Sequence, residues 1–134
     1  MHPRTRQSLH DVIAACIEIE SRTDEVSVRS YRSDRDLQLM IERILMTVGE
    51  ALSRAEKHDP LLVAALPNAR NIIEMRNRIV HCDLALNREI FWTAAVRHAP
   101  ILRSQTEEVL GEQEDVPERS EGIIGYVELA ELKS

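Results

Sequence analysis

The sequence has few of the residues on which several classes of protein depend. Aromatic residues make up only 3% of its 134 residues, and there are four glycines and five prolines. So few aromatic residues, together with many Leu, Ala, Glu and Arg residues, favour helices over strands. The two cysteines, Cys16 and Cys82, lie far apart and match no disulfide framework, so we expect both thiols to be reduced.

Long apolar runs are also absent. No segment approaches the roughly 18 apolar residues that a transmembrane helix needs. The basic residues near the N-terminus are not followed by an apolar stretch, because Asp11 soon interrupts, so no export signal is predicted. We therefore expect a cytoplasmic protein, with no membrane contact, that forms one domain with a moderate core.

Charge is distributed unevenly along the chain. The formal net charge is −6, and residues 111–134 contribute most of it, with seven acidic and two basic side chains. Residues 70–103 instead contain six arginines and three acidic residues. Arginine binds phosphate through paired hydrogen bonds, so this region could bind an anion such as RNA. Scattered solvated arginines would explain the same pattern equally well.

Apolar residues recur at helical spacing in four long segments. The predicted helices span residues 5–22, 34–57, 68–81 and 87–110, with shorter apolar or helical pieces at 27–31 and 61–66. Short connections between long helices are typical of an antiparallel four-helix bundle, so the predicted fold class is all-α. We divide the chain into a helical domain, residues 1–110, and an acidic C-terminal tail, residues 111–134.

Individual residues predict where these helices begin, end and touch. Asp34 and Asn87 are suited to cap helix N-termini, and Pro67 could be the first residue of a helix. Gly111 is predicted to end the last helix. Gly49 lies inside the second helix, where glycine costs about 1 kcal/mol relative to alanine, so we expect a close contact with another helix.

The segment that could carry out chemistry lies at the end of the third predicted helix. Arg76 and His81 are five residues apart and therefore point about 140° apart around a regular helix. Asn77 and His81 are four apart, so the Asn77 amide could orient the His81 imidazole. A histidine can remove the 2′-hydroxyl proton of RNA, and an arginine can stabilise the charged phosphorane. A histidine at a helix C-terminus can equally be a favourable partner of the helix dipole.

Two motifs together resemble the HEPN superfamily and, within it, the HepT-like toxins. One is Arg76-Asn77-x-x-x-His81 with the following Asn87–Trp92 segment, and the other is Val48-Gly49-Glu50-Ala51. The resemblance covers roughly residues 5–110. It implies a homodimeric helical bundle that acts as a metal-independent endoribonuclease, with its site at the dimer interface.

The resemblance also implies site residues and partners. Arg76 and His81 would be the catalytic pair, with Asn77 as a polar helper. The implied setting is a type VII-like toxin–antitoxin pair, in which a minimal nucleotidyltransferase similar to MntA neutralises a toxin that cleaves RNA. No cofactor and no metal site are predicted. Supporting roles are predicted for Arg78, which lies within the motif, for Asp83, and for Glu50, which could pair with an arginine of the site.

One residue departs from the family pattern. HepT-like proteins commonly have a tyrosine two residues after the histidine, a target for AMP transfer by the partner, and this sequence has Asp83 there. Asp83 could orient His81 or Arg78, and the partner could act by occlusion. Two other functions remain open: a catalytically weak or inactive helical partner of a nucleotidyltransferase, and a nucleotide-binding module. Trp92 is expected in the core or at the dimer interface, and His98 is expected to be packed and hydrogen-bonded.

Overall fold

The structure, a computed structural model, describes residues 1–81 and 87–115, and in this part of the chain every regular element is a helix. The helices are α1 (Pro3–Thr23), α2 (Val28–Ser33), α3 (Arg35–His58), α4 (Pro60–Ala64), α5 (Ala69–Val80), α6 (Arg88–Thr93), the π-helix η1 (Ala94–His98) and α7 (Ala99–Asp115). The predicted all-α class is therefore confirmed for the described residues.

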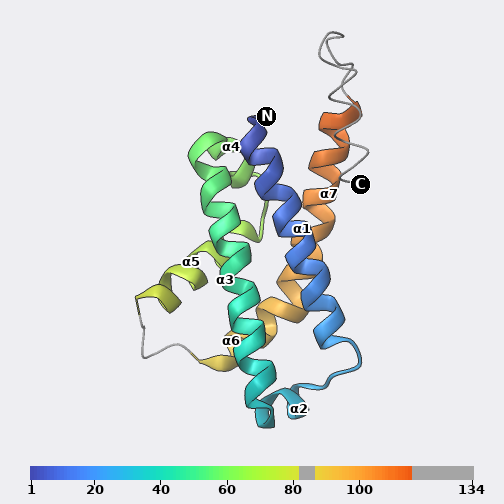
Figure 1. Cartoon of the computed structure of the whole chain (residues 1–134), viewed down its shortest axis with the longest axis vertical. Coiled ribbons are helices and arrows are strands. Elements are labelled where there is room, and N and C mark those ends of the chain that lie inside the picture. The colour runs from blue at the N-terminus through green and yellow to red at the C-terminus, as the bar shows by residue number, and fades with distance from the viewer. Residues whose placement is uncertain (82–86, 116–134) are drawn as a thin grey trace.

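The long helices α1, α3 and α7 pack around one apolar core. Figure 1 shows α1 running opposite to both α3 and α7, whereas α5 and α6 cross the long helices obliquely. Three of the four predicted helices thus follow the antiparallel arrangement, and α5 differs by leaving the side of α3 at an angle. The buried side chains include Leu9, Val12, Ile19, Ile41, Leu45, Leu52, Ile72 and Leu102. These residues follow the helical spacing seen in the sequence, because only one face of each helix is turned inward.

Polar caps fix most helix beginnings. The Asp34 carboxylate accepts a hydrogen bond from the backbone N–H of Leu37 at 3.0 Å, and the Asn87 side chain accepts one from Glu89 N–H at 2.8 Å. Both predicted caps are confirmed. The prediction for Pro67 is wrong: α5 begins at Ala69, with Asn68 in the capping position.

The last predicted helix is not continuous. Its middle turn is the π-helix η1, which is closed by a hydrogen bond from Ala99 N–H to the carbonyl of Ala94. Pro100 follows directly and has no N–H to donate, and its ring would crowd the preceding turn of a regular helix. A wider π turn relieves this crowding. The chain accordingly changes direction between α6 and α7 (Figure 1).

The end of the last helix also differs from the prediction. Helix α7 passes through Gly111 and continues to Asp115. Gly111 does not adopt the positive φ of a glycine that ends a helix, since no glycine in the described residues has a positive φ. The further residues of the acidic tail lie outside the described residues. Within residues 1–81 and 87–115, no helix is long and apolar enough to cross a membrane.

Candidate active site on helix α5

Helix α5 is pressed against α3 at Gly49, and this contact positions Arg76. A Cβ atom built on Gly49 would lie 2.5 Å from the Cβ and 3.0 Å from the Cγ of Arg76. It would also lie 3.2 Å from the carbonyl oxygen of Ile72. Because real Cβ atoms essentially never lie as close as 2.5 Å to another heavy atom, a larger residue at Gly49 would force the two helices to shift. The close helix contact expected at Gly49 is confirmed, and it is made to Arg76 itself.

The Arg76 guanidinium is held by its sequence neighbour. Arg76 Nη1 donates a hydrogen bond to Asn77 Oδ1 at 3.0 Å, and both side chains are half-buried. The Nε of Arg76 is buried and has no hydrogen-bond partner in the described part of the chain. Buried polar groups almost always have partners, so a buried guanidinium nitrogen that lacks one is a marker of functional interest.

His81 occupies the C-terminal end of α5 and is exposed. Its backbone N–H donates to the Asn77 carbonyl at 3.0 Å, which makes His81 the C-cap of the helix. The Asn77 side chain bonds Arg76 in this structure. Helical spacing alone predicts a bond to the His81 ring instead. The physical reason is the length of the arginine side chain, which can turn back to an adjacent residue although the two Cβ atoms point in different directions.

The other predicted site residues occupy different positions. Arg78 lines a cavity beside α5, as described below. Glu50 is half-buried and forms no ion pair among residues 1–81 and 87–112, so the predicted pairing with a site arginine is not seen there. Asp83 and Cys82 lie outside the described residues. Among the residues that the structure describes, no group of three or more histidine, cysteine, aspartate or glutamate side chains could hold a metal ion.

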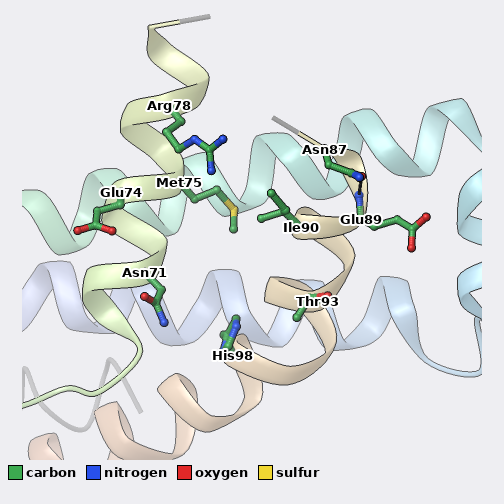
Figure 2. A pocket seen from close by; sticks show the side chains of 9 residues that line it. All are labelled: Asn71, Glu74, Met75, Arg78, Asn87, Glu89, Ile90, Thr93 and His98. Carbon is green, nitrogen blue, oxygen red and sulfur yellow. Dashed lines mark hydrogen bonds between the residues drawn. The ribbon is translucent and has the colours of Figure 1, made fainter. Parts of the chain in front are cut away.

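A cavity of about 470 Å³ lies between α5 and the α6–η1 segment. It is lined by Asn71, Glu74, Met75 and Arg78 from α5, by Asn87, which caps α6, by Glu89, Ile90 and Thr93 from α6, and by His98 from η1. Figure 2 shows the Arg78 guanidinium reaching from α5 toward α6 across this space, with Met75 and Ile90 forming an apolar wall. Its volume falls within the usual range of small-ligand sites, about 300–1,000 Å³.

His98 is fixed at the edge of this cavity. Its Nδ1 lies 3.1 Å from Asn68 Oδ1, so the ring is half-buried and hydrogen-bonded, as predicted. Asn68 occupies the capping position of α5 but makes no side-chain cap, because its side chain is engaged with His98 instead. The π-helix places His98 here, since a wider turn shifts the side chains that follow it relative to a regular helix.

A buried tyrosine anchors the α6 side of the cavity. The Tyr31 hydroxyl donates to the Arg88 carbonyl at 3.0 Å, and its ring packs on half-buried Trp92, with ring centroids 5.0 Å apart. Burial raises the pKa of Tyr31 to about 12, so its hydroxyl remains a hydrogen-bond donor at neutral pH. Trp92 thus contributes to packing within the chain.

Most residues of the cavity were not predicted from the sequence. Asn71, Glu74 and Arg78 follow the i, i+3, i+7 spacing of one helix face, which is a signal that all three side chains point the same way. The α6 residues opposite them have no such signal, because the tertiary fold brings them there. On a regular helix His81 would project within about 20° of Glu74, but it is the C-cap residue that follows α5 and is not one of the residues that line the cavity.

Comparison with known proteins agrees with the motifs. The model of the family described as ribonuclease HepT-like matches residues 12–109. A protein of Thermococcus cleftensis named “Probable ribonuclease HepT” is 24% identical over 101 residues, which are 75% of this chain and 91% of that protein. A “Putative RNase” of Caldanaerobacter subterraneus subsp. tengcongensis is 25% identical over 105 residues, which are 78% of this chain and 93% of the relative.

No solved structure matches the chain. The family match spans well over half of the sequence and includes both α3 with Gly49 and α5 with Arg76. The match confirms the family that the two sequence motifs predict. The chain belongs to the HepT-like ribonuclease family.

Proposed function

We propose that this chain is an endoribonuclease toxin that cleaves RNA in the cytoplasm, with Arg76 and His81 as its catalytic pair and no metal cofactor. The observation that carries the proposal is the constrained geometry of Arg76. Its stem is held against Gly49, its Nη1 is bonded to Asn77, and its buried Nε has no partner within the described residues. An arginine held in this way is preorganised to receive an anion.

The proposed reaction is an intramolecular transesterification at phosphorus. His81 removes the proton from a ribose 2′-hydroxyl, and the 2′-oxygen attacks the adjacent phosphorus. Arg76 stabilises the extra negative charge of the phosphorane, and Asn77 positions Arg76. The bond to the 5′-oxygen then breaks, and that oxygen takes a proton from a second acid. The products are a 2′,3′-cyclic phosphate and a free 5′-hydroxyl.

A second copy of the chain would supply that acid. Arg76 and His81 point about 140° apart on one helix, so a single copy does not aim both at one phosphate in a regular helix. A twofold axis near the end of α5 would bring two histidines and two arginines to one cleft, where one histidine acts as base and the other as acid. Exposed Val80, next to His81, supports an interface at this end of α5.

The cavity between α5 and α6 is suited to a nucleotide beside the cleaved bond. Arg78 provides a cation on its wall, and the Asn71 amide and Glu74 carboxylate provide groups that can bond a base edge. Family membership further supports a toxin–antitoxin setting, in which an MntA-like nucleotidyltransferase is the antitoxin.

The decisive experiment measures cleavage of labelled RNA by the purified protein with a chelator present. His81→Ala should lower the rate about 100-fold or more, because general base catalysis typically contributes factors of 10² to 10⁴. Arg76→Ala should lower it comparably, and Arg43→Ala, on the exposed side of α3, is the matched control. Cleavage by His81→Ala at the rate of the parent protein would show the catalytic assignment to be wrong.

The cavity also favours a second candidate function, nucleotide binding without cleavage. Its volume and its mixture of apolar and polar walls fit a mononucleotide. Calorimetric titration with ATP and with cyclic nucleotides tests this function. Tight binding that Asn71→Ala abolishes, together with no RNA cleavage by the parent protein, would select it over the ribonuclease.

A further inference from the structure

A second cavity, of about 330 Å³, lies in the groove between α1 and α3, away from α5. Three permanently cationic side chains line it, Arg4, Arg54 and Lys57, together with His58. Asp11 is the one carboxylate among the described lining residues. In a chain with a net charge of −6, this is a locally reversed balance of charge.

Asp11 is already engaged on both of its oxygens. Its Oδ1 accepts a hydrogen bond from Gln7 Nε2 at 3.1 Å, and its Oδ2 lies 3.5 Å from Arg54 Nη2. Asp11 therefore compensates Arg54. Arg4 and Lys57 form no ion pair with the residues that the structure describes. The groove thus retains two uncompensated positive charges.

Helix dipoles explain one of these two cations but not the other. Lys57 lies in the last turn of α3, where a positive charge is favourable. Arg4 lies in the first turn of α1, which contains no acidic residue and carries the positive end of the dipole. The charge of Arg4 therefore destabilises the helix electrostatically, and a bound anion would offset this cost.

His58 is held in place at the same groove. Its ring stacks on His2, with ring centroids 4.0 Å apart and the planes 15° from parallel. His2 is fixed in turn by two hydrogen bonds of 3.0 Å. Its ring Nδ1 accepts one from the backbone N–H of Arg4, and its backbone N–H donates the other to Asp59 Oδ2. The groove therefore has an oriented imidazole beside its two uncompensated cations.

We propose that the groove between α1 and α3 binds a phosphate group through Arg4, Lys57 and His58. Phosphate accepts several charge-assisted hydrogen bonds at once, so it suits a groove whose cations come from two helices, α1 and α3. The two sources of such a group are the backbone of an RNA and free phosphate. The groove lies apart from Arg76 and His81, so it would bind RNA outside the cleavage site, and its binding does not depend on whether RNA is cleaved.

The test uses the full chain and a single-stranded 2′-O-methyl RNA, which cannot be cleaved because its 2′-oxygen is blocked. Fluorescence anisotropy gives the affinity at several salt concentrations. The double variant Arg4→Gln/Lys57→Gln should bind at least about fivefold more weakly. Its affinity should also depend less steeply on salt, because binding with fewer phosphate contacts releases fewer counterions. Arg29→Gln/Arg43→Gln removes the same charge from exposed positions elsewhere and is the matched control.

Titration with inorganic phosphate separates the two sources. Weaker RNA binding by the groove variant alone, with no phosphate binding by the parent, identifies the RNA backbone. Phosphate binding that the groove variant loses, with unchanged RNA affinity, identifies free phosphate. Equal behaviour of the groove and control variants in both titrations overturns the proposal, as does binding of acidic peptides but of neither phosphate source. Loss of affinity in a protein that fails to cleave unmodified RNA would contradict the ribonuclease and leave the phosphate site standing.

Discussion

The two sides of α5 are built differently. On the side toward α3, Ile72 and Ile73 are buried, and the stem of Arg76 lies against Gly49 with no room for even a methyl group. On the side toward α6, Asn71, Glu74 and Arg78 line a cavity of about 470 Å³. One side therefore fixes where the helix lies, and the other leaves space for a ligand. A rigid support behind an open pocket is the arrangement that a precise binding site requires.

The largest effect should come from the closed side. Ile72→Ala removes a side chain that is 1% exposed and should lower the free energy of unfolding by about 2–5 kcal/mol, through lost burial and a cavity. Its neighbour Asn71, on the open side, is exposed, and Asn71→Ala should change stability by less than about 0.5 kcal/mol. Denaturant unfolding measures both. Equal losses would contradict the comparison.

The contact between α3 and α5 can be tested at a single carbon atom. Gly49→Ala should destabilise the protein by about 1–3 kcal/mol, because its Cβ would overlap the stem of Arg76. It should also slow RNA cleavage by displacing that arginine. Thermal unfolding and the cleavage assay measure the two effects.

The control for this substitution is Gly111→Ala in α7. A Cβ at Gly111 meets nothing within 4 Å, so only helix propensity changes. That variant should gain about 0.5–1 kcal/mol. A Gly49→Ala protein as stable and as active as the parent would show that the helices can separate without cost.

The anchor of the open side should contribute less. Tyr31→Phe removes the hydrogen bond to the Arg88 carbonyl and should cost about 0.5–1.5 kcal/mol, with faster hydrogen exchange in α6. Thr47→Val is the control, since the Thr47 hydroxyl bonds the Arg43 carbonyl on an exposed surface. If exchange in α6 stays unchanged, the tyrosine does not hold the cavity wall.

The smallest effect is expected at an exposed ion pair on the open side. Arg32 donates two hydrogen bonds to Glu89, at 2.9 and 2.8 Å, and both side chains are about half exposed. Hydrogen bonds from Arg32 lower the pKa of Glu89. A lowered carboxyl pKa adds stability above the unfolded value, near 4.3, and this stability is lost as the pH falls through the lower folded value.

Arg32→Ala should therefore change the melting temperature slightly at neutral pH and high salt. The difference between the variant and the parent should vanish in acid below the carboxyl range. Thermal unfolding from about pH 2 to about pH 7, a range that spans the usual titration of carboxyl groups, measures this difference in melting temperature. A difference that grows in acid would contradict the assignment.

Features that depend on neighbouring residues are largely predictable from the sequence. Asp34 and Asn87 cap helices as predicted, because a capping side chain bonds the backbone two or three residues along the chain. The exception was Pro100, whose effect on the preceding turn was overlooked, so the π-helix was not expected. The prediction that Gly111 ends the last helix was also wrong, because glycine permits a helix to end but does not force it to end.

The candidate site was predicted only in part. Arg76, Asn77 and His81 are predicted as site residues from spacing and family resemblance, and spacing predicts that the Asn77 side chain bonds His81. The structure pairs it with Arg76 instead. Side-chain pairing on a helix depends on rotamers as well as on Cβ direction, and neighbouring helices select the rotamers.

The sequence by itself determined the helices of this protein, the apolar face of each one and the motif at the end of α5. These features follow from backbone hydrogen bonds and from a period of 3.6 residues, both of which act over short stretches of chain. Only the tertiary structure decided that Gly49 would fix Arg76, that α6 would close a cavity against α5, and that cations of α1 and α3 would share one groove. Each of these depends on packing between side chains that are distant in sequence.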